Sequence, residues 1–383
     1  MNIIFLEAVQ DHGGARKSTI ELAKRLDSET GINTLIVDFY GSNKDFIKDV
    51  EQNMVQCRIL DKRDQPFIIQ DKNKLKELSN YLTFFAERKK LQNKLHKIID
   101  DFKPDFFIVN NSKTLSLIPE SANYKKVLFA RGWFIPSQIS VKDKFVYKKA
   151  DLFMAVSQST RQALFSGKMA PLDKIYVVKN GIDLNNPFFK EPKKENDTLT
   201  IIHSGSFIAE KGHHITIGVS KKLKELGIPH KIYLTGKVHQ ADGSPEYFRE
   251  IKKQIADFQL EDYIEIIANT NNILPYMKEA DLFLHPSDTE GLPRVIMEAM
   301  ALKTLVIANS VGGVTDYVLD GFTGFIADFN NIHHYVELIQ DVLNHPERKK
   351  QIVENAYALI QDCYSPDSQV NEMKRILNEN MKS

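Results

Sequence analysis

The chain has 383 residues, of which 42% are hydrophobic and 26% charged, with a formal net charge of +1. This ordinary composition excludes a disordered chain, and the small net charge gives no electrostatic reason to expect nucleic-acid binding. The length exceeds what one hydrophobic core usually supports, so we expect two domains.

The cysteines and the apolar runs exclude further classes of protein. Cys57 and Cys363 lie far apart and predict neither a disulfide framework nor a cysteine metal site. The first residues lack the basic, apolar and small-residue segments of a signal peptide, and no run of about 18 apolar residues occurs. We therefore expect a cytoplasmic protein, with attachment at the inner face of a membrane as a further option.

The first predicted element is a strand at Asn2–Leu6, followed by the sequence "DHGGARKST". Its Lys-Ser-Thr ending is similar to that of a P-loop, but a P-loop has Gly directly before the lysine, and here Arg16 precedes Lys17. A strand, a glycine pair and a helix still direct backbone N–H groups toward an anion. The sequence thus favours an anion site at Gly13-Gly14, with a plain tight turn as the alternative.

Short apolar runs then alternate with longer amphipathic ones, which predicts parallel sheets with crossover helices, twice over. The segment 180–198 holds turn residues, two prolines and a charged cluster, as linkers do. We expect an N-terminal domain over 1–186, a C-terminal domain over 187–365, and a helix over 366–383 that packs back on the first domain. The predicted strands after the first are Thr34–Phe39, Phe106–Val109, Lys126–Phe129, Leu152–Val156, Ile175–Val178, Leu199–His203, His230–Thr235, Ile264–Ile267, Leu282–His285 and Leu305–Ala308.

The segment from Lys74 to Lys97 is the most basic of the chain, with seven Lys or Arg against two Glu. Leucine and phenylalanine side chains recur there at helical spacings of three and four. One interpretation is a surface helix with a solvated basic side. The other is contact with an anionic membrane surface.

The residues from 279 to 326 contain two glutamates, Glu290 and Glu298, with seven residues between them. Leu282–His285 is the strand, a loop follows it, and Pro293 suits the first turn of the next helix. Backbone N–H groups at such a helix start can bind a diphosphate, and a carboxylate within the helix can accept hydrogen bonds from a pair of hydroxyls.

This segment resembles the glycosyltransferases of family 4, which carry a Glu, seven residues and a second Glu. Further segments resemble the family in the same order along the chain: "HGGARKSTIELAKRL", "IIDDFKPDFFIVNN", "NGIDLNNPF", "IIHSGSFIAEKGHHITI" and "GGVTDYVLDGFTGFI". The resemblance implies a GT-B fold, in which two doubly wound Rossmann-like domains face each other across a cleft. The first domain would be the acceptor side and the second the donor side.

The resemblance further implies a transferase for a hexosyl or N-acetylhexosaminyl group, with retention at the anomeric carbon. The donor would be a nucleotide-diphosphate-sugar, in the first place a UDP-sugar. The acceptor would be a glycan or a lipid-linked molecule in cell-surface polysaccharide or cell-wall synthesis. No cofactor and no metal is expected. The chain contains no Asp-x-Asp, the usual carboxylate pair for a diphosphate-bound divalent ion, so lysine and helix starts would meet the diphosphate charge.

Carried over residue by residue, the resemblance assigns Lys211 to the diphosphate, Glu290 to the sugar hydroxyls and Glu298 to the ribose. Lys211 and Glu290 are the expected catalytic residues. Gly14 is expected to approach the donor phosphate from the other domain. The full set expected to bind the donor is Gly14, Ser206, Lys211, Glu290, Gly291, Leu292, Pro293 and Glu298.

Two positions depart from the family pattern. Ser206 stands where many members have an arginine, and Arg131 where many have a histidine. On the acceptor side, Arg16, Arg131 and Trp133 are the candidates for contact. These departures leave open a non-catalytic glycosyltransferase-like partner subunit as an alternative. A separate alternative is a sugar-nucleotide epimerase of the same fold.

Overall fold

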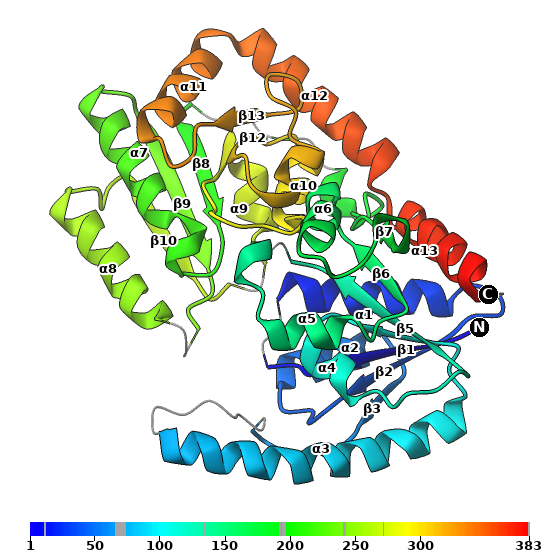
Figure 1. The fold of residues 1–383 in the computed structure, drawn as a ribbon. Coiled ribbons are helices and arrows are strands. Elements are labelled where there is room, and N and C mark those ends of the chain that lie inside the picture. The colour runs from blue at the N-terminus through cyan, green and yellow to red at the C-terminus, as the bar shows by residue number, and fades with distance from the viewer. Residues whose placement is uncertain are drawn as a thin grey trace. The chain divides into compact units, whose positions relative to one another are not determined.

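The computed structural model describes residues 1–10, 13–65, 74–132, 135–190, 193, 197–239, 243–270 and 272–381. The chain divides into two compact units (Figure 1). Unit 1 comprises Met1–Val178 together with Gln369–Ser383, and unit 2 comprises Lys179–Ser368.

Unit 1 is built around a seven-stranded sheet in the order β3-β2-β1-β4-β5-β6-β7, with all neighbours parallel. The central strands are almost fully buried, as expected for a parallel sheet covered on both faces. The strand order reverses between β1 and β4, which creates a topological switch point at their carboxyl ends. The strands are β1 (Asn2–Glu7), β2 (Asn33–Asp38), β3 (Cys57–Ile59), β4 (Phe106–Val109), β5 (Lys125–Ala130), β6 (Leu152–Ala155) and β7 (Ile175–Val177).

The helices of unit 1 follow the strands as crossovers. Several begin at an Asn or Ser whose side chain accepts a hydrogen bond from a first-turn N–H, which stabilises the helix start. Most of α13 (Pro366–Met381) belongs to this unit, where Lys374 forms an ion pair with Glu29. The other helices are α1 (Gly14–Asp27), α2 (Lys44–Gln52), α3 (Lys74–Phe102), α4 (Ser112–Leu117), α5 (Val141–Tyr147) and α6 (Gln158–Ser166), with 3-10 turns η1 (Pro136–Gln138) and η2 (Leu172–Lys174).

Unit 2 has a six-stranded parallel sheet in the order β10-β9-β8-β11-β12-β13. Its switch point lies between β8 and β11. The strands are β8 (Leu199–Ser204), β9 (His230–Gly236), β10 (Ile264–Ala268), β11 (Leu282–His285), β12 (Leu305–Asn309) and β13 (Phe325–Ala327). The helices are α7 (His213–Glu225), α8 (Ser244–Asp257), α9 (Leu274–Glu279), α10 (Arg294–Ala301), α11 (Ile332–Asn344) and α12 (Pro346–Cys363), with η3 (Pro187–Phe189), η4 (Ala209–Lys211) and η5 (Gly312–Asp316).

The two predicted parallel sheets are confirmed, but the sequence prediction missed β3 and β13. Each has three residues and lies at one edge of its sheet; β7 is equally short, but it lies within the longer apolar run Ile175–Val178. A smaller correction concerns Pro293, which is the N-cap of α10 rather than a residue of its first turn.

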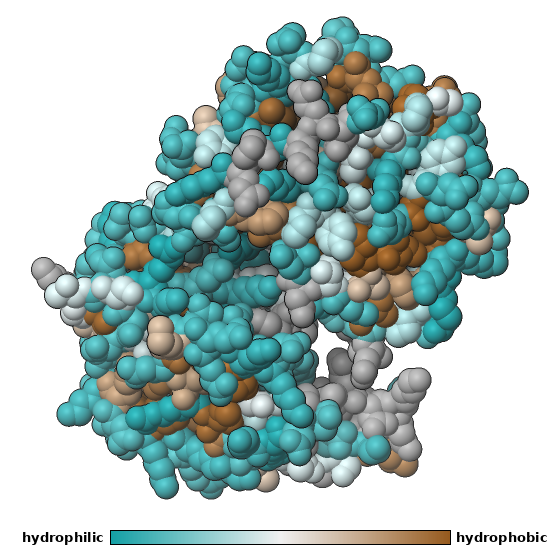
Figure 2. Space-filling view, turned by 180° about the vertical axis from the view of Figure 1, so that it is seen from behind, coloured by the Kyte–Doolittle hydropathy of each residue, from teal (hydrophilic) through white to brown (hydrophobic). Residues whose placement is uncertain are grey.

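The surface is mainly hydrophilic on the face seen in Figure 2, with separate hydrophobic patches. Within the described ranges, no helix is both long and apolar enough to cross a membrane.

Candidate functional site

The candidate site of unit 2 is a group of ionisable and polar side chains at its switch point, where the loops after β8 and β11 meet. The backbone N–H of Asp288 donates to the carbonyl of Glu210 at 2.8 Å, which joins the two loops. Crevices outside the carboxyl ends of strands at a switch point are where doubly wound sheets bind ligands.

Lys211 and Glu290, predicted as separate ligand contacts, lie against each other. Lys211 Nζ is 2.6 Å from Glu290 Oε1, and Nε2 of His285 donates to the same oxygen at 3.0 Å. Burial opposes ionisation of Glu290, but Lys211 and His285 outweigh it and lower the pKa of Glu290 to about 2. Within the described ranges, Glu290 Oε2 accepts no hydrogen bond, so this oxygen remains available to a ligand.

Two glycines are required for this arrangement, Gly212 and Gly312, and a third, Gly205, lies under the Lys211 side chain. The stem of Lys211 lies over Gly205, where an added Cβ would be 3.2 Å from two of its carbons. Gly212 has φ of +73°, and an added Cβ would come within 2.2 Å of the Pro286 carbonyl oxygen. Gly312, at φ of +50°, would place a Cβ 1.7 Å from the carbonyl oxygen of Glu290. The absence of a side chain at Gly312 therefore allows this residue to pack directly against the backbone of Glu290.

A buried asparagine, Asn309, also holds the loop that carries Glu290. Asn309, at the end of β12, donates to the Ser287 carbonyl at 3.2 Å and to Asn330 Oδ1 at 2.9 Å. Tyr335 donates to Asn309 Oδ1 at 3.0 Å, and Asn330 in turn donates to Asp288 at 3.1 Å. This network fixes the loop that carries Glu290, as a preorganised binding site requires.

The start of α10 carries the other predicted donor contacts. Glu298 is 20% exposed and lies 3.2 Å from Arg294 Nε, one turn earlier in the helix. The carbonyl of Gly291 accepts from Gly313, whereas no described residue accepts from the N–H groups of Gly291 and Leu292. These two N–H groups lie beside the N-cap Pro293, at the positive end of the helix dipole.

Two histidines at this edge were not assigned a role from the sequence. His239 lies 2.9 Å from the Ser206 hydroxyl, so the position that departs from the family pattern has an imidazole partner. His285 supports Glu290 directly. Its place as the last residue of β11 was the signal available in the sequence, since the carboxyl end of a central strand faces the switch point. His203 is 1% exposed and bonded to Thr216, which makes it a packed core residue.

The carboxyl end of β1 forms a second polar cluster, in unit 1. The predicted strand, glycine pair and helix are confirmed, with Gly13 as the N-cap of α1 and Gly14 its first residue. Arg16 Nη1 is 2.6 Å from Glu7 Oε2, and Asn110 donates to both oxygens of Glu7 at 3.1 and 3.0 Å. Arg16 is thus committed to a buried carboxylate.

Arg131 also belongs to this buried cluster. Its guanidinium donates to Ser18 at 2.8 Å and lies over the Phe129 ring at 4.3 Å. Burial lowers the pKa of Arg131 to about 10, against the opposing effect of Glu7. Its Nη2 is buried and lacks a partner among the described residues. Trp133 lies outside the described residues.

Part of the basic side of α3 contacts its own unit. Lys90 and Lys94 lie 2.9 and 2.7 Å from the Asp61 carboxylate, and Arg88 donates to the Ser116 carbonyl at 2.6 Å. The apolar side chains of Leu75 and Phe85 are 79% and 63% exposed. In the described ranges, no three His, Cys, Asp or Glu side chains are grouped as they would be around a metal ion.

Comparison with solved structures identifies the class of fold to which this architecture belongs. A glycosyltransferase from Rickettsia africae ESF-5 has a TM-score of 0.79 at 20% identity, covering 100% of this chain and 99% of that one. Anabaena Alr3699/HepE, solved with UDP-glucose, has a TM-score of 0.79 at 20% identity, covering 99% and 100%. Two parallel α/β sheets and these likenesses define a GT-B fold.

The family follows from two further matches. The model for Glycosyltransferase Family 4 matches residues 12–186, and that for Glycosyl transferases group 1 matches residues 185–359. The chain belongs to the glycosyltransferases of the family 4 type.

Among curated relatives, the putative colanic acid biosynthesis glycosyltransferase WcaL of Salmonella typhimurium is 26% identical over 49% of this chain and 46% of its own length. The capsular polysaccharide biosynthesis glycosyltransferase CapM of Staphylococcus aureus is 25% identical over 60% of this chain and 62% of its own. The chain spans about half the length of the curated relatives it matches.

Proposed function

We propose that the protein transfers a sugar from a nucleotide-diphosphate-sugar, a UDP-sugar in the first place, to a glycan or lipid-linked acceptor of cell-surface polysaccharide. The observation that carries the proposal is the Lys211–Glu290–His285 cluster at the switch point of unit 2. The names of WcaL and CapM, and the UDP-glucose complex of the Anabaena protein, support the substrate class.

In the proposed complex, Lys211 and the N–H groups at the start of α10 bind the diphosphate. Lys211 exchanges its contact with Glu290 for the phosphate oxygens, and this contact strengthens as the leaving group gains charge. Glu290 accepts from the sugar hydroxyls through Oε2, and His285 keeps its carboxylate in place. Glu298 accepts from the ribose hydroxyls.

The proposed reaction retains the configuration of the sugar. The bond from the anomeric carbon to the phosphate oxygen breaks, the bond to the acceptor oxygen forms on the same face, and a leaving-phosphate oxygen takes the acceptor proton. No divalent ion is required in this scheme, because Lys211 and the α10 start balance the charge of the diphosphate.

Nucleotide binding tests the donor site. A nucleoside diphosphate at 100 times its Kd should add about 2.7 kcal/mol to the free energy of unfolding. We expect UDP to raise the melting temperature more than GDP or ADP does. Glu298→Ala should reduce this effect, while Glu265→Ala, on an exposed part of β10, should preserve it. Failure of all three nucleotides to stabilise the chain would contradict the donor assignment.

Product analysis tests the reaction. The purified chain is incubated with labelled UDP-glucose and UDP-N-acetylglucosamine and a panel of glycan and lipid-linked acceptors, with and without EDTA. We expect a retained anomeric configuration and full activity in EDTA. Nucleotide binding without transfer or donor hydrolysis would favour the non-catalytic subunit, and an epimerised donor without acceptor would favour the epimerase.

Membrane contact through residues 74–97 remains part of the proposal. The exposed Leu75 and Phe85 support it, whereas the engagement of Arg88, Lys90 and Lys94 within unit 1 reduces the charge available for it. Co-sedimentation with anionic vesicles should decline with salt, because screening shortens the range of the attraction. Equal binding to neutral vesicles would contradict this contact.

A further inference from the structure

One helix of unit 1 presents large apolar side chains to solvent. In α5, Val141 is 86% and Phe145 is 69% exposed, and none of the seven residues of the helix is buried. The other side of α5 is anchored, because Val146 and Tyr147 pack against the apolar core of unit 1. Residues four apart lie on one face of a helix, so Val141 and Phe145 form one apolar stripe. The stripe is therefore the outer face of a helix that its inner face holds in place.

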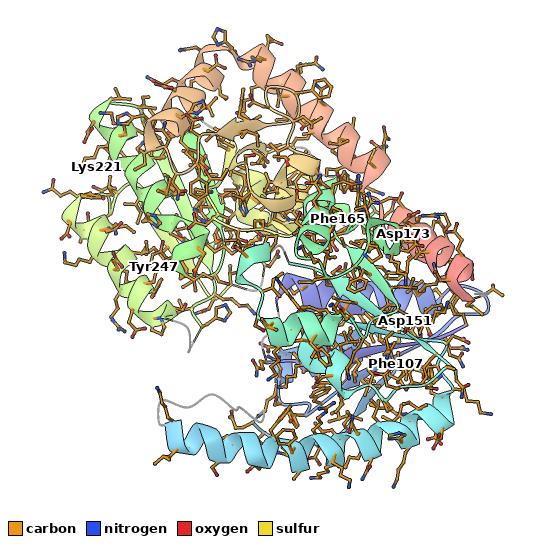
Figure 3. All side chains as sticks on the ribbon, viewed as in Figure 1. Phe107, Asp151, Phe165, Asp173, Lys221 and Tyr247 are labelled. Carbon is orange, nitrogen blue, oxygen red and sulfur yellow. The ribbon has the colours of Figure 1, made fainter. Side chains whose placement is uncertain are left out.

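This stripe continues into a hollow beside the end of α6. Lys148, the C-cap of α5, is seven positions after Val141, which places it on the same helix face. It lines the hollow together with Phe165, which is 51% exposed and lies at the end of α6 (Figure 3). The other lining residues are Ser166, Lys168, Met169, Ala170 and Pro171. The outer side of α5 and the end of α6 thus form one continuous surface.

Three lysines are interleaved with the apolar side chains of this surface. Lys144 lies three positions after Val141 on α5, Lys148 ends the helix, and Lys168 follows α6. Among the described residues, none of the three lysines has an ion pair, a side-chain hydrogen bond or an aromatic ring as a partner. We refer to this surface as the α5–α6 face, and its residues are Val141, Lys144, Phe145, Lys148, Phe165 and Lys168.

The other charged residues around the α5–α6 face cancel, since they comprise four lysines and four carboxylates. Lys142 lies beside Asp143, and Lys174 follows Asp173 in η2. In the remaining group, two lysines pair with one glutamate, and an aspartate accepts a backbone N–H; these residues are Lys126, Lys149, Glu120 and Asp151. The three lysines of the α5–α6 face therefore leave a surplus of positive charge beside the apolar side chains.

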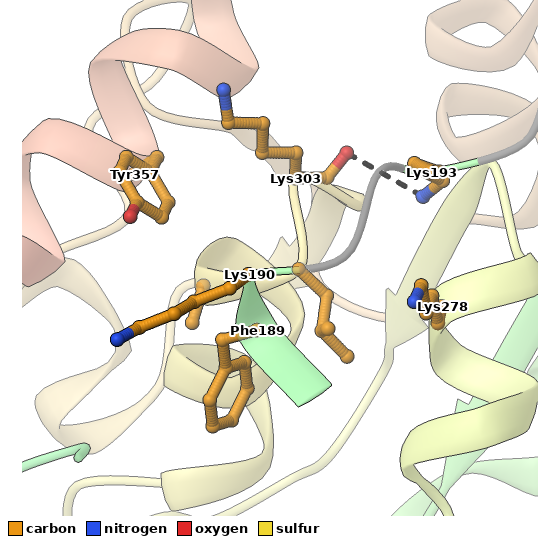
Figure 4. Close-up of a pocket in the computed structure, with 8 residues that line it drawn as sticks. Phe189, Lys190, Lys193, Lys278, Lys303 and Tyr357 are labelled. Atoms are coloured by element: carbon orange, nitrogen blue, oxygen red, sulfur yellow. Dashed lines mark hydrogen bonds between the residues drawn. The ribbon is translucent and has the colours of Figure 1, made fainter. Parts of the chain in front are cut away.

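A lysine-lined hollow of unit 2 shows the opposite situation (Figure 4). There Lys303 pairs with Glu354, and Lys193 donates to the Lys303 carbonyl at 3.4 Å. Lys278, which also lines that hollow, lies 5.0 Å from the centre of the Phe188 ring. Because these lysines are already engaged, their number gives no surplus charge. The lysines of the α5–α6 face differ in having no such partners.

The combination of apolar side chains and lysines fits a lipid surface better than a protein partner. Protein interfaces are enriched in arginine and depleted in lysine, whereas the α5–α6 face has three lysines and no arginine. Lysine stems pack along apolar surface while their ammonium groups stay in a polar environment. Helices at a membrane interface likewise direct apolar side chains toward the acyl chains and lysines toward anionic headgroups.

We propose that the α5–α6 face binds the surface of an anionic membrane. Val141, Phe145 and Phe165 enter the boundary between headgroups and acyl chains, and the three lysines contact lipid phosphates. This contact is separate from the one proposed for residues 74–97. It depends neither on the sugar that is transferred nor on the acceptor.

Vesicle co-sedimentation of the full chain tests the apolar part of the face. The vesicles contain phosphatidylcholine with or without phosphatidylglycerol. We expect Val141→Gln with Phe145→Gln to weaken binding to the anionic vesicles roughly tenfold or more, because the apolar area buried in the interface is lost. The matched control is Phe322→Gln with Phe329→Gln, at side chains of unit 2 that are 56% and 58% exposed, and it should leave binding unchanged.

A triple variant tests the lysines. Lys144→Gln with Lys148→Gln and Lys168→Gln should weaken binding to anionic vesicles about 100-fold, since each lysine at such a surface contributes about fivefold. The control replaces the exposed lysines Lys221, Lys252 and Lys350 of unit 2 by Gln and should change binding less than about twofold. Because all these side chains lie at the surface, each variant should melt within about 2 °C of the wild type.

Tryptophan fluorescence provides an independent readout of insertion. Brominated lipids quench a tryptophan that enters the bilayer, and the single natural tryptophan, Trp133, gives the same background in every variant. We expect anionic brominated vesicles to quench Phe145→Trp clearly more than Phe322→Trp. Equal quenching of the two variants would overturn the proposal.

Other results would also overturn it. These are absence of binding to anionic vesicles, equal binding to neutral vesicles, and wild-type affinity of the Val141–Phe145 variant or of the lysine triple variant. Loss of binding only in Leu75→Gln with Phe85→Gln would place the membrane contact on α3 instead. A wild-type dimer in light scattering that Val141→Gln with Phe145→Gln dissociates would show that a second copy of the chain covers this face.

Discussion

The two switch points of the molecule each hold a glutamate beside a cation, yet the two carboxylates differ in what they can do. Glu7, the last residue of β1, is 3% exposed and has both oxygens engaged by Arg16, Asn110 and Thr19. Glu290, in the loop after β11, shares one oxygen between Lys211 and His285. Both oxygens of the first carboxylate have partners in its own unit, whereas among the described residues the second has partners on one oxygen only.

Their pKa values shift in opposite directions because the balance between burial and neighbouring cations differs at the two sites. Burial raises the pKa of Glu7, and Arg16, Arg131 and Asn110 offset it in part. At Glu290 the lysine and histidine outweigh burial, and the pKa falls to about 2. The contrast indicates that a carboxylate next to a cation is not by itself a binding site. Whether such a carboxylate can bind a ligand depends on how many of its oxygens lack a partner within the protein.

The largest expected effect comes from removing Glu7, the carboxylate whose oxygens both have partners within the protein. Glu7→Ala would leave Arg16 and Arg131 buried without their carboxylate, so the free energy of unfolding should fall by about 3–5 kcal/mol. Urea unfolding measures this loss. Glu7→Gln, which retains an oxygen acceptor, is the control and should lose less. A loss below 1 kcal/mol would show that the cluster does not stabilise unit 1.

The next effect concerns Lys211, the cation beside Glu290 at the candidate donor site. If Lys211 has the role proposed above, Lys211→Ala should lower kcat on the order of 100-fold, or about 2.7 kcal/mol, because the substitution would remove a donor to the developing charge of the leaving group. Steady-state kinetics with a UDP-sugar measure it, with Lys221→Ala on the exposed side of α7 as the matched control. An unchanged kcat would exclude Lys211 from this role.

The pH dependence of stability separates the two carboxylates. Because the folded-state pKa of Glu290 lies below its ordinary value of 4.5, its contribution is present above pH 4.5 and is lost as the pH falls toward 2. Glu7, with a raised pKa, acts with the opposite sign. The stability advantage of the wild type over Glu290→Gln should shrink by about 2 kcal/mol between pH 6 and pH 3. Glu7 is present in both proteins and cancels. A constant difference would mean that folding does not lower the pKa of Glu290.

The smallest expected change in stability is at Gly14. An added Cβ there meets no heavy atom within 4 Å, and Ala favours a helix over Gly by up to about 1 kcal/mol. Gly14→Ala should therefore fold at least as well as the wild type. If a donor phosphate approaches this residue, the donor KM should rise about tenfold. Unchanged stability with unchanged KM would remove Gly14 from the donor site.

The sequence by itself determined the two parallel sheets, and it contains the local patterns on which the candidate donor site is based. Strands such as Leu282–His285 are apolar because both faces of a parallel sheet are covered, and this composition is visible without neighbours. The glycine pair at the start of α1 and the glutamates around α10 are likewise local patterns. Their spacing follows from strand, turn and helix geometry alone.

Only the tertiary structure decided which side chains meet. Lys211 and Glu290 are 79 positions apart, and Arg131 reaches Ser18 across 113 positions, so no local spacing predicts either contact. The same holds for Lys90 and Lys94, which bind Asp61 rather than forming a free basic face. A sequence reports which groups are present. Whether a charged side chain is paired within the protein or is accessible to a ligand depends on the neighbours that folding brings together.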